Sequence, residues 1–346
     1  MAMPKTETPM SGTLDTHDLV LALKAAAETT RLRILMLLAA GELNVKDLTQ
    51  ILGQSQPRIS RHLKLLAEAG LIERFREGSW VYFHVSDRSE GGKLARRILE
   101  TVDTRDPVLR RDSTRAEALK HEREAAAQTY FREHAADWDR IRTLYVSETA
   151  VAQAIAAALA GPPLKLLADL GTGTGRMLEV LADRYERGLG LDVNQSMLDY
   201  ARSRLKSAGL ARAEVRHGDI YTVALPDGAA DGVVIHQVLH YLSEPAHAVR
   251  EAARILAPGG RLLIVDFAPH EIEELRERHA HERLGFDGAQ VTAWLTEAEL
   301  SDVEVRSPEP ENHDDRQQLT VSLWLGHKPL AADTERQTQK LERIGS

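Results

Sequence analysis

Three aspartates in the C-terminal half of the chain each stand directly after an apolar or mixed run that is typical of a strand. They are Asp169, Asp192 and Asp219, and the first is followed at once by the glycine-rich segment LGTGTG. Runs of this kind alternate with helical segments from Leu164 onwards, which predicts a parallel sheet. Since the carboxyl ends of parallel strands meet at one edge, we expect the three carboxylates to lie together beside backbone that a ligand can approach closely.

The spacing of the glycines and the place of the acids indicate which ligand this edge binds. A nicotinamide cofactor requires its third glycine one position later, where this chain has Arg176. Asp169 is an unfavourable neighbour for a pyrophosphate but suits a cationic sulfonium and an amino group. Asp192 can accept both ribose hydroxyls, and Asp219 can accept the adenine amino group. The predicted cofactor is therefore S-adenosyl-L-methionine (SAM), with S-adenosyl-L-homocysteine (SAH) as product or effector.

The segment LLADLGTGTGRMLEVLADRYERGLGLDVNQSMLDYA resembles class I SAM-dependent methyltransferases of the small-molecule type, and the resemblance extends from about Asp137 to Leu325. The helix with Tyr130, Phe131 and Trp138 is similar to the lid segment that precedes the core of such enzymes, although aromatics that merely dock a helix on the sheet explain it equally well. The candidate cofactor contacts are Asp169, Gly171, Thr172, Gly173, Gly175, Asp192, Val193, Asp219, Ile220, His236, Tyr130 and Trp138.

The segment IHQVLHYL, after the predicted fourth strand, bears on the methyl acceptor. It lacks the Asn/Asp-Pro-Pro-aromatic tetrapeptide with which nucleic-acid amino methyltransferases hold a flipped base, and the chain has no cysteine with which to bind arsenite. A small O-, N- or C-nucleophile remains. His236 and His240 are candidate general bases, with packing or hydrogen bonding alone as the alternative. No metal site is expected, because His279 and His281 are two apart and cannot share a helical face.

The N-terminal stretch TRLRILMLLAAGELNVKDLTQILGQSQPRISRHLKLLAEAGLIERFREGSWVYFHV resembles the ArsR/SmtB family of winged-helix repressors. The resemblance implies binding to double-stranded operator DNA as a homodimer, through Leu19–Ala27 and the helix after Asp87. Asn44 and Lys46 stand where arsenic-sensing members carry thiolates, so we expect no soft-metal sensing. The candidate DNA contacts, on the recognition helix and the hairpin, are Gln56, Arg58, Ser60, Arg61, His62, Lys64, Arg74, Arg76 and Ser79.

Length, charge and hydropathy agree with two joined domains. The 346 residues predict an α/β protein, in which an N-terminal winged helix-turn-helix (α+β) precedes a Rossmann-like class I methyltransferase sheet that ends in an antiparallel hairpin. The net charge of −8 argues against nonspecific coating of nucleic acid. No apolar run approaches the roughly 20 residues of a membrane span, and no secretory signal is evident, so a cytoplasmic protein is expected. The expected boundaries are 1–16 tail, 17–102 winged helix, 103–145 linker and helical lid, 146–328 methyltransferase, and 329–346 disordered tail.

Three functions remain open from the sequence. The first is a repressor whose second domain binds SAM and methylates a small molecule. The second is a non-catalytic repressor that senses SAM or SAH and controls genes of the methionine/SAM cycle. The third is a small-molecule methyltransferase whose winged helix serves only for dimerisation. In this case the winged helix makes protein contacts and does not bind DNA.

Overall fold

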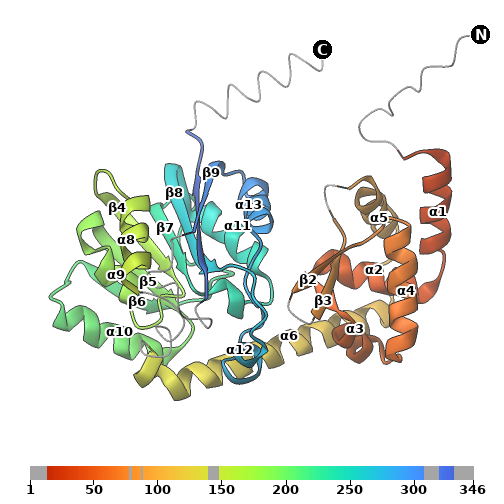
Figure 1. The fold of residues 1–346 in the computed structure, drawn as a ribbon, viewed down its shortest axis with the longest axis horizontal. Helices are drawn as coiled ribbons and strands as arrows, with labels where there is room; N and C mark the ends of the chain where they lie inside the picture. The colour runs from red at the N-terminus through yellow and green to blue at the C-terminus, as the bar shows by residue number, and fades with distance from the viewer. Residues whose placement is uncertain (1–13, 78–79, 87–88, 139–147, 308–318, 331–346) are drawn as a thin grey trace, which may run out of the picture. The chain divides into compact units, whose positions relative to one another are not determined.

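The computed structural model describes residues 14–77, 80–86, 89–138, 148–307 and 319–330 (Figure 1). It divides into two compact units, Met1–Glu122 and Arg123–Ser346. This division falls inside one long helix, α6 (Pro107–His134). The two units are described separately below.

The first unit is a helical bundle with a small antiparallel sheet, in the order of a winged helix. Within the described residues its helices are α1 (Thr16–Ala26), α2 (Thr29–Ala40), α3 (Val45–Leu52), α4 (Gln56–Glu68) and α5 (Glu90–Glu100). Its strands are β1 (Leu43–Asn44), β2 (Glu73–Glu77) and β3 (Trp80–His84), in the order β1-β3-β2.

Local sequence fixes both ends of α3 and determines which face of α4 is buried. Asn44 and Asp47 form a reciprocal capping box at the start of α3, and Gly53 ends that helix in the left-handed conformation (φ +65°). In α4, Ile59, Leu63 and Leu66 are buried at helical spacing, so the opposite face of this helix is left exposed.

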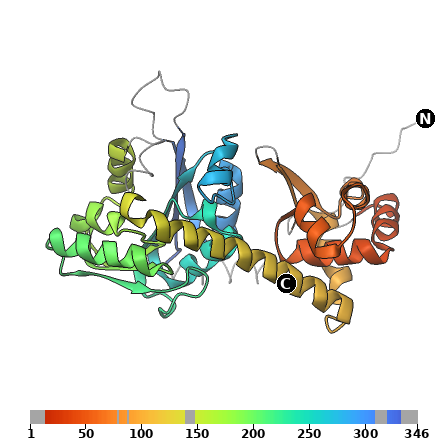
Figure 2. The same cartoon turned by 90° about the horizontal axis from the view of Figure 1, so that it is seen from below.

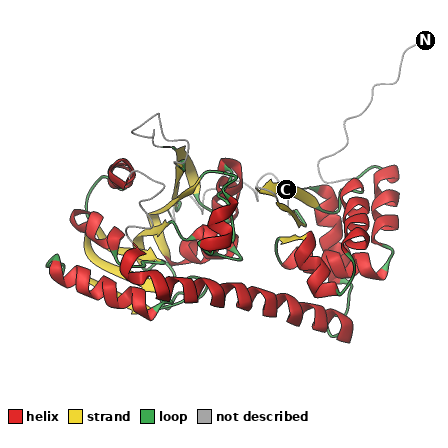
Figure 3. Ribbon diagram, turned by 60° about the horizontal axis from the view of Figure 1, so that its bottom comes forward, coloured by secondary structure: helices red, strands yellow, loops and turns green. Residues whose placement is uncertain are grey.

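The second unit is a doubly wound sheet. In the described part of the chain it has seven strands, in the order β6-β5-β4-β7-β8-β10-β9, and the first five are parallel (Figure 3). The strands are β4 (Leu164–Leu170), β5 (Tyr185–Asp192), β6 (Ala213–His217), β7 (Ala230–His236), β8 (Leu256–Phe267), β9 (Ser301–Arg306) and β10 (Val321–His327). The expected terminal hairpin is confirmed, because β10 pairs antiparallel with β9 and β8.

Helices cover both faces of this sheet. Neighbouring side chains of β7 point to opposite faces: Val234 belongs to one core cluster, Val233 and Ile235 to the other. Helices α8 (Glu148–Ala158), α9 (Arg176–Val180) and α10 (Gln195–Ser207) cover the first face, and α11 (Pro245–Ile255) and α13 (Gly288–Glu297) cover the second. The shorter elements are η1 (Ala135–Asp137), η2 (Ala182–Arg184), η3 (Leu239–Tyr241) and α12 (Glu273–Arg278). The α/β class and the winged helix predicted from the sequence are confirmed.

Helix α6 begins earlier than its charged sequence indicates. Residues 103–145 are expected to hold a linker and a helical lid, and most of the expected linker is itself helical, because α6 starts at Pro107 and continues to His134 (Figure 2). Asp106 explains the start, because its Oδ1 accepts hydrogen bonds from the backbone N–H groups of Val108 (2.7 Å) and Leu109 (3.2 Å). A proline in the first helical turn is favourable, because the backbone N–H that proline lacks would have no acceptor within the helix at this position.

Candidate functional site

The turn after β4 brings bare backbone to the edge of the sheet. Gly171 and Gly173 have φ values of +71° and +52°, a region that glycine adopts without strain. A side chain at position 171 is also excluded by space, because a Cβ there would lie 2.5 Å from Cγ2 of Val238, in the loop after β7. The glycine therefore lets two loops meet at the point where the strand order reverses, which is where doubly wound sheets bind ligands.

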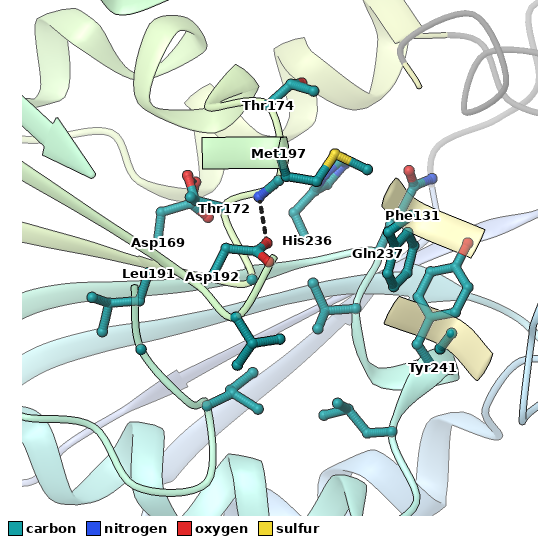
Figure 4. Close-up of a pocket in the computed structure, with 18 of the residues that line it drawn as sticks. Phe131, Asp169, Thr172, Thr174, Leu191, Asp192, Met197, His236, Gln237 and Tyr241 are labelled. Carbon is teal, nitrogen blue, oxygen red and sulfur yellow. Dashed lines mark hydrogen bonds between the residues drawn. The ribbon is translucent and has the colours of Figure 1, made fainter. Parts of the chain in front are cut away.

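Two of the three predicted aspartates are held in place by hydrogen bonds at this edge. Oδ2 of Asp169 accepts from the Thr172 hydroxyl (2.6 Å), and Oδ2 of Asp192 accepts from the backbone N–H of Gly173 (2.9 Å) (Figure 4). Oδ1 of Asp192 also accepts from the N–H of Asn194 (2.8 Å). The third, Asp219, is exposed and its Oδ1 accepts from the N–H of Tyr221.

Burial makes these carboxylates ready for a cation. Burial, with a smaller contribution from the nearby Asp192, raises the pKa of Asp169 to about 7, although the hydrogen bond from Thr172 acts in the opposite direction. Burial also raises the pKa of Asp192, although hydrogen bonds from Asn194 and Gly173 act in the opposite direction. A positively charged ligand offsets part of the cost of burying an ionised carboxylate. The site is thus suited to a sulfonium or an ammonium group.

A cavity of about 320 Å³ opens at this edge. Most of the predicted cofactor residues line it: Asp169, Gly171, Thr172, Gly173, Asp192, Val193, Asp219, Ile220, His236 and Trp138. Gly175 and Tyr130 are not among its lining residues. Four carboxylates and one guanidinium belong to the lining, which gives the cavity an excess of negative charge: Glu124, Asp169, Asp192, Asp219 and Arg176.

The C-terminal half of α6 forms one wall of the cavity. Glu124, Ala127, Gln128 and Phe131 line it from this helix. The helix is attached beside the predicted ribose site, because Nδ2 of Asn194 donates to the carbonyl and to Oε1 of Gln128 (3.1 and 3.0 Å). The lid implied by the resemblance therefore supplies Phe131 and the nearby Trp138 to the cavity.

Two further contacts hold α6 against the segment after α12. Nη1 of Arg123 lies 3.1 Å from Oε1 of Glu282. The hydroxyl of Tyr130 lies 2.6 Å from Nδ1 of His279. Tyr130 thus anchors the lid helix instead of lining the cavity.

The two candidate catalytic histidines occupy different environments. His236, at the end of β7, lines the cavity. His240 is 1% exposed, its Nδ1 lies 2.7 Å from Oδ1 of Asp266, and it is not among the lining residues. The hydrogen-bonding alternative fits His240, and of these two histidines only His236 lines the cavity.

The cavity also contains residues that sequence reasoning did not select. Glu124 and Gln128 lie on a helix far from the sheet in sequence, and Met197 and Tyr241 follow the second and fourth parallel strands. Gln237, which the sequence places beside His236 after the fourth strand, lines the cavity as well. Gln237 has a left-handed backbone (φ +53°), which nothing in its sequence context announces. For Tyr241, the available signal was a tyrosine five residues after the last residue of β7, His236.

The predicted DNA contacts gather on α4 and β2 in the first unit. The side chains of Gln56, Arg58, Ser60, Arg61 and Lys64 on α4 are exposed, as are those of Arg74 and Arg76 on β2. His62 instead turns inward: its side chain is 12% exposed and Nδ1 lies 3.7 Å from Oε2 of Glu28. Ser79 lies outside the described residues. A polar helix face beside a basic strand is the surface that a winged helix presents to DNA.

Comparison with known proteins identifies both units. A family model for bacterial regulatory proteins of the arsR family matches residues 28–74, and a methyltransferase domain model matches residues 168–264. The chain joins an ArsR-type DNA-binding domain to a SAM-dependent methyltransferase domain. The cofactor predicted from the three aspartates is thereby confirmed as SAM.

Individual relatives match one domain or the other. The ArsR-type domain is 52% identical over 64 residues to the arsenical resistance operon repressor of Escherichia coli, covering 18% of this chain and 55% of that protein. The methyltransferase domain is 31% identical over 135 residues to a probable S-adenosylmethionine-dependent methyltransferase of Mycolicibacterium smegmatis, covering 38% of this chain and 49% of that protein. This chain thus spans about half the length of these curated relatives.

Among solved structures, the YcgJ protein of Bacillus subtilis is 19% identical, with a TM-score of 0.43 and coverage of 51% of this chain and 97% of that one. In the described ranges, no helix has the length and apolar character needed to cross a membrane. The same ranges contain no group of three or more His, Asp or Glu side chains placed to hold a metal ion.

Proposed function

We propose that this chain is a transcriptional repressor whose methyltransferase domain transfers the methyl group of SAM to a small molecule. Its affinity for operator DNA then depends on whether the cavity holds SAM or SAH. The observation that carries this proposal is that one helix, α6, contributes both to the ArsR-type domain and to the wall of the SAM cavity.

The first half of α6 is bound to the ArsR-type domain by a buried ion pair. Nε and Nη2 of Arg33, on α2, donate to the two carboxylate oxygens of Asp112 (2.5 and 2.9 Å), and the side chains are 12% and 2% exposed. Arg115 donates to the carbonyl of Ile51 at the end of α3 (3.0 Å). These contacts connect α6 to the two helices that support α4.

The second half of α6 meets the ligand. Gln128 is bound to Asn194, which is itself bound to Asp192, the residue expected to accept the ribose hydroxyls. A ligand that prefers one arrangement of α6 changes operator affinity by the same factor by which operator DNA changes ligand affinity. Coupling energies of this kind typically correspond to about 5- to 150-fold changes in affinity.

The test is a titration of labelled operator DNA with the full-length protein without ligand, with SAM and with SAH. We expect at least one ligand to change the operator dissociation constant, in the roughly 5- to 150-fold range. Asp192→Ala should need more than about tenfold more ligand for the same effect, since the ribose hydroxyls lose a charged acceptor. Asp183→Ala, which removes an exposed carboxylate on η2, is the matched control and should behave as wild type.

Equal operator affinity under all three conditions would disprove the regulatory part of the proposal. Transfer of labelled methyl from SAM into a metabolite extract, measured alongside, tests the catalytic part.

We also propose that the repressor is a homodimer. Helix α1 exposes Leu19, Val20, Leu21 and Leu23, at 37–47% of their surface. These side chains lie on several sides of the helix, and a helix that is apolar on most sides favours burial against another protein surface. A two-fold dimer suits a palindromic operator. Molar mass from light scattering, taken on the titration samples, tests this state.

A non-catalytic sensor is the second candidate. Burial raises the pKa of both phenols in the cavity, Tyr221 and Tyr241, so that they stay protonated at neutral pH. Neither phenol is therefore available as a general base, and His236 is the only imidazole among the described lining residues. Operator control by SAM or SAH without any methyl transfer would favour this candidate.

A further inference from the structure

Gln237 places an unused hydrogen-bond acceptor at the cavity. Its side chain is 6% exposed, it lines the cavity, and Oε1 is buried without a hydrogen-bond partner among the described residues. Its backbone is fixed in the left-handed region (φ +53°), and its N–H donates to the carbonyl of Val265 (2.7 Å). A strained, buried amide with an empty acceptor position is a feature that ligand sites retain and packed cores avoid.

Three aromatic rings that pack against one another line the same cavity, and the ring of Trp138 extends toward the glycine turn. The ring centroid of Phe131 lies 4.7 Å from that of Tyr241 and 5.2 Å from that of Trp138, and all three residues line the cavity. Phe131, Gln237 and Tyr241 lie together in Figure 4, away from Asp169. Aromatic faces attract cations, so this end combines an amide oxygen with surfaces that favour positive charge.

From this arrangement we infer that the methyl acceptor is an amine, whose N–H donates to Oε1 of Gln237 and whose nitrogen faces the rings of Phe131, Trp138 and Tyr241. This inference rests on the proposed methyl transfer from SAM.

The reaction is balanced with SAM and the amine alone. The lone pair of the neutral amine forms the C–N bond as the C–S bond breaks, and the electron pair of that bond goes to sulfur, which gives neutral SAH. The positive charge passes to nitrogen, and the ammonium product later loses a proton to water. The amide oxygen and the ring faces stabilise the charge where it develops.

An alcohol is less suited to this end of the cavity. A hydroxyl must give up its proton as it is methylated, and a carboxamide cannot take that proton. The raised pKa of Tyr241 keeps its phenol protonated as well. His236 lies in the same cavity, and for that reason alcohols are included in the test.

The test measures transfer of tritiated methyl from SAM by the full-length protein to matched probes. The pairs are tryptamine with tryptophol, benzylamine with benzyl alcohol, and butylamine with butanol. We expect methylation of at least one amine and none of its alcohol. Gln237→Leu should lower the rate with that amine roughly tenfold or more, because a buried N–H loses its acceptor. SAM affinity, measured by calorimetry, should stay unchanged.

Two further variants separate a ligand contact from a loss of structure. Gln237→Glu keeps an acceptor oxygen at the same place and should retain amine methylation. If Gln237→Leu lost activity only because the packing around position 237 was disturbed, the Glu variant would lose activity as well. Gln153→Leu changes an exposed glutamine on α8 outside the cavity and should match wild type.

Methylation of alcohols without amines would overturn the inference. So would a Gln237→Leu variant whose SAM affinity falls by the same factor as its rate, because the nitrogen at Oε1 would then be the amino group of the cofactor. If the protein binds SAM and its operator affinity responds to SAM or SAH, but no amine is methylated, this inference is wrong and the proposed ligand-dependent repressor still stands. Absence of SAM binding to the wild type removes both.

Discussion

At the scale of single residues, the proposed SAM site lowers the stability of the folded protein. Asp169 is 1% exposed at the end of β4, and burial raises its pKa from 3.8 to about 7. A buried carboxylate whose pKa rises on folding binds more protons in the folded state. Its ionisation therefore destabilises the empty protein progressively as the pH rises from about 4 through 7. A cationic ligand recovers part of this cost on binding.

Asp169→Asn tests this relation. The empty variant should unfold at a higher temperature than wild type at pH 8, by about 2–4 °C for each kcal/mol recovered, and the difference should shrink at pH 5. SAM affinity of the wild type should increase from pH 6 to pH 8, whereas the weaker binding by the variant should not change with pH. Calorimetry at three pH values measures both quantities, with Asp183→Asn as the control for an exposed carboxylate. A variant that is less stable than wild type at pH 8 would contradict this account.

At the scale of elements, α4 separates the residues that hold the fold from those that face DNA. Ile59, Leu63 and Leu66 are buried on one side, while Arg58 and Arg61 are exposed on the other. His62 lies between the two faces and contacts Glu28, at the start of α2. Burial lowers the pKa of His62 against the attraction of Glu28, so this residue supports the helix in its neutral form.

Arg61→Ala should weaken operator binding roughly tenfold, as expected for one lost base or phosphate contact. SAM affinity should be unaffected, because Arg61 lies in the ArsR-type domain. If the contact is to phosphate, the slope of log affinity against log salt concentration should fall by about 1. Arg105→Ala, which removes an exposed arginine paired only locally with Asp103, is the control. Loss of SAM binding together with DNA binding would indicate misfolding.

At the scale of the whole molecule, α6 is shared by two domains that each have a core. Ala116 and Leu119 of α6 are partly buried and pack against the core of the ArsR-type domain, and Ala127 and Phe131 line the proposed SAM cavity. Two cores of this kind are expected to unfold in separate steps, unless the shared helix couples them. The pair Arg33–Asp112 attaches α6 to the first domain through two hydrogen bonds between little-exposed side chains.

Scanning calorimetry of the full-length protein should show this coupling. SAM at 100 times its dissociation constant stabilises the domain that binds it by about 2.7 kcal/mol, and we expect the ArsR-type transition to rise as well. Asp112→Asn leaves Arg33 as a buried unpaired charge, which should destabilise the first domain by about 3–5 kcal/mol. The transition of that domain should then stop responding to SAM. Asp103→Asn, which changes an exposed ion pair with Arg105, is the control and should leave both unfolding temperatures unchanged. If SAM does not raise the unfolding temperature of the ArsR-type domain in the wild type, the coupling is disproved.

Local patterns were sufficient to predict most of the fold. Helical spacing of apolar residues identified α4, and the alternation of strands and helices identified the doubly wound sheet, because each signal lies within about ten residues of sequence. The sequence did not reveal where α6 starts within residues 103–145, since Asp106 and Pro107 resemble a charged linker and only the structure shows that the Asp106 carboxylate caps the helix.

The sequence by itself determined the cofactor: Asp169, the glycine turn and Asp192 are near one another in the chain, and the parallel sheet brings such strand ends together. Only the tertiary structure decided what else meets the cavity. In the structure Phe131 and Gln128 of α6 line the cavity, whereas Tyr130 and His240 do not. The amide of Gln237 lines the cavity as well, from a residue with a left-handed backbone. These positions depend on long-range packing and on one unusual backbone angle, and neither of these is encoded in the residues next to them.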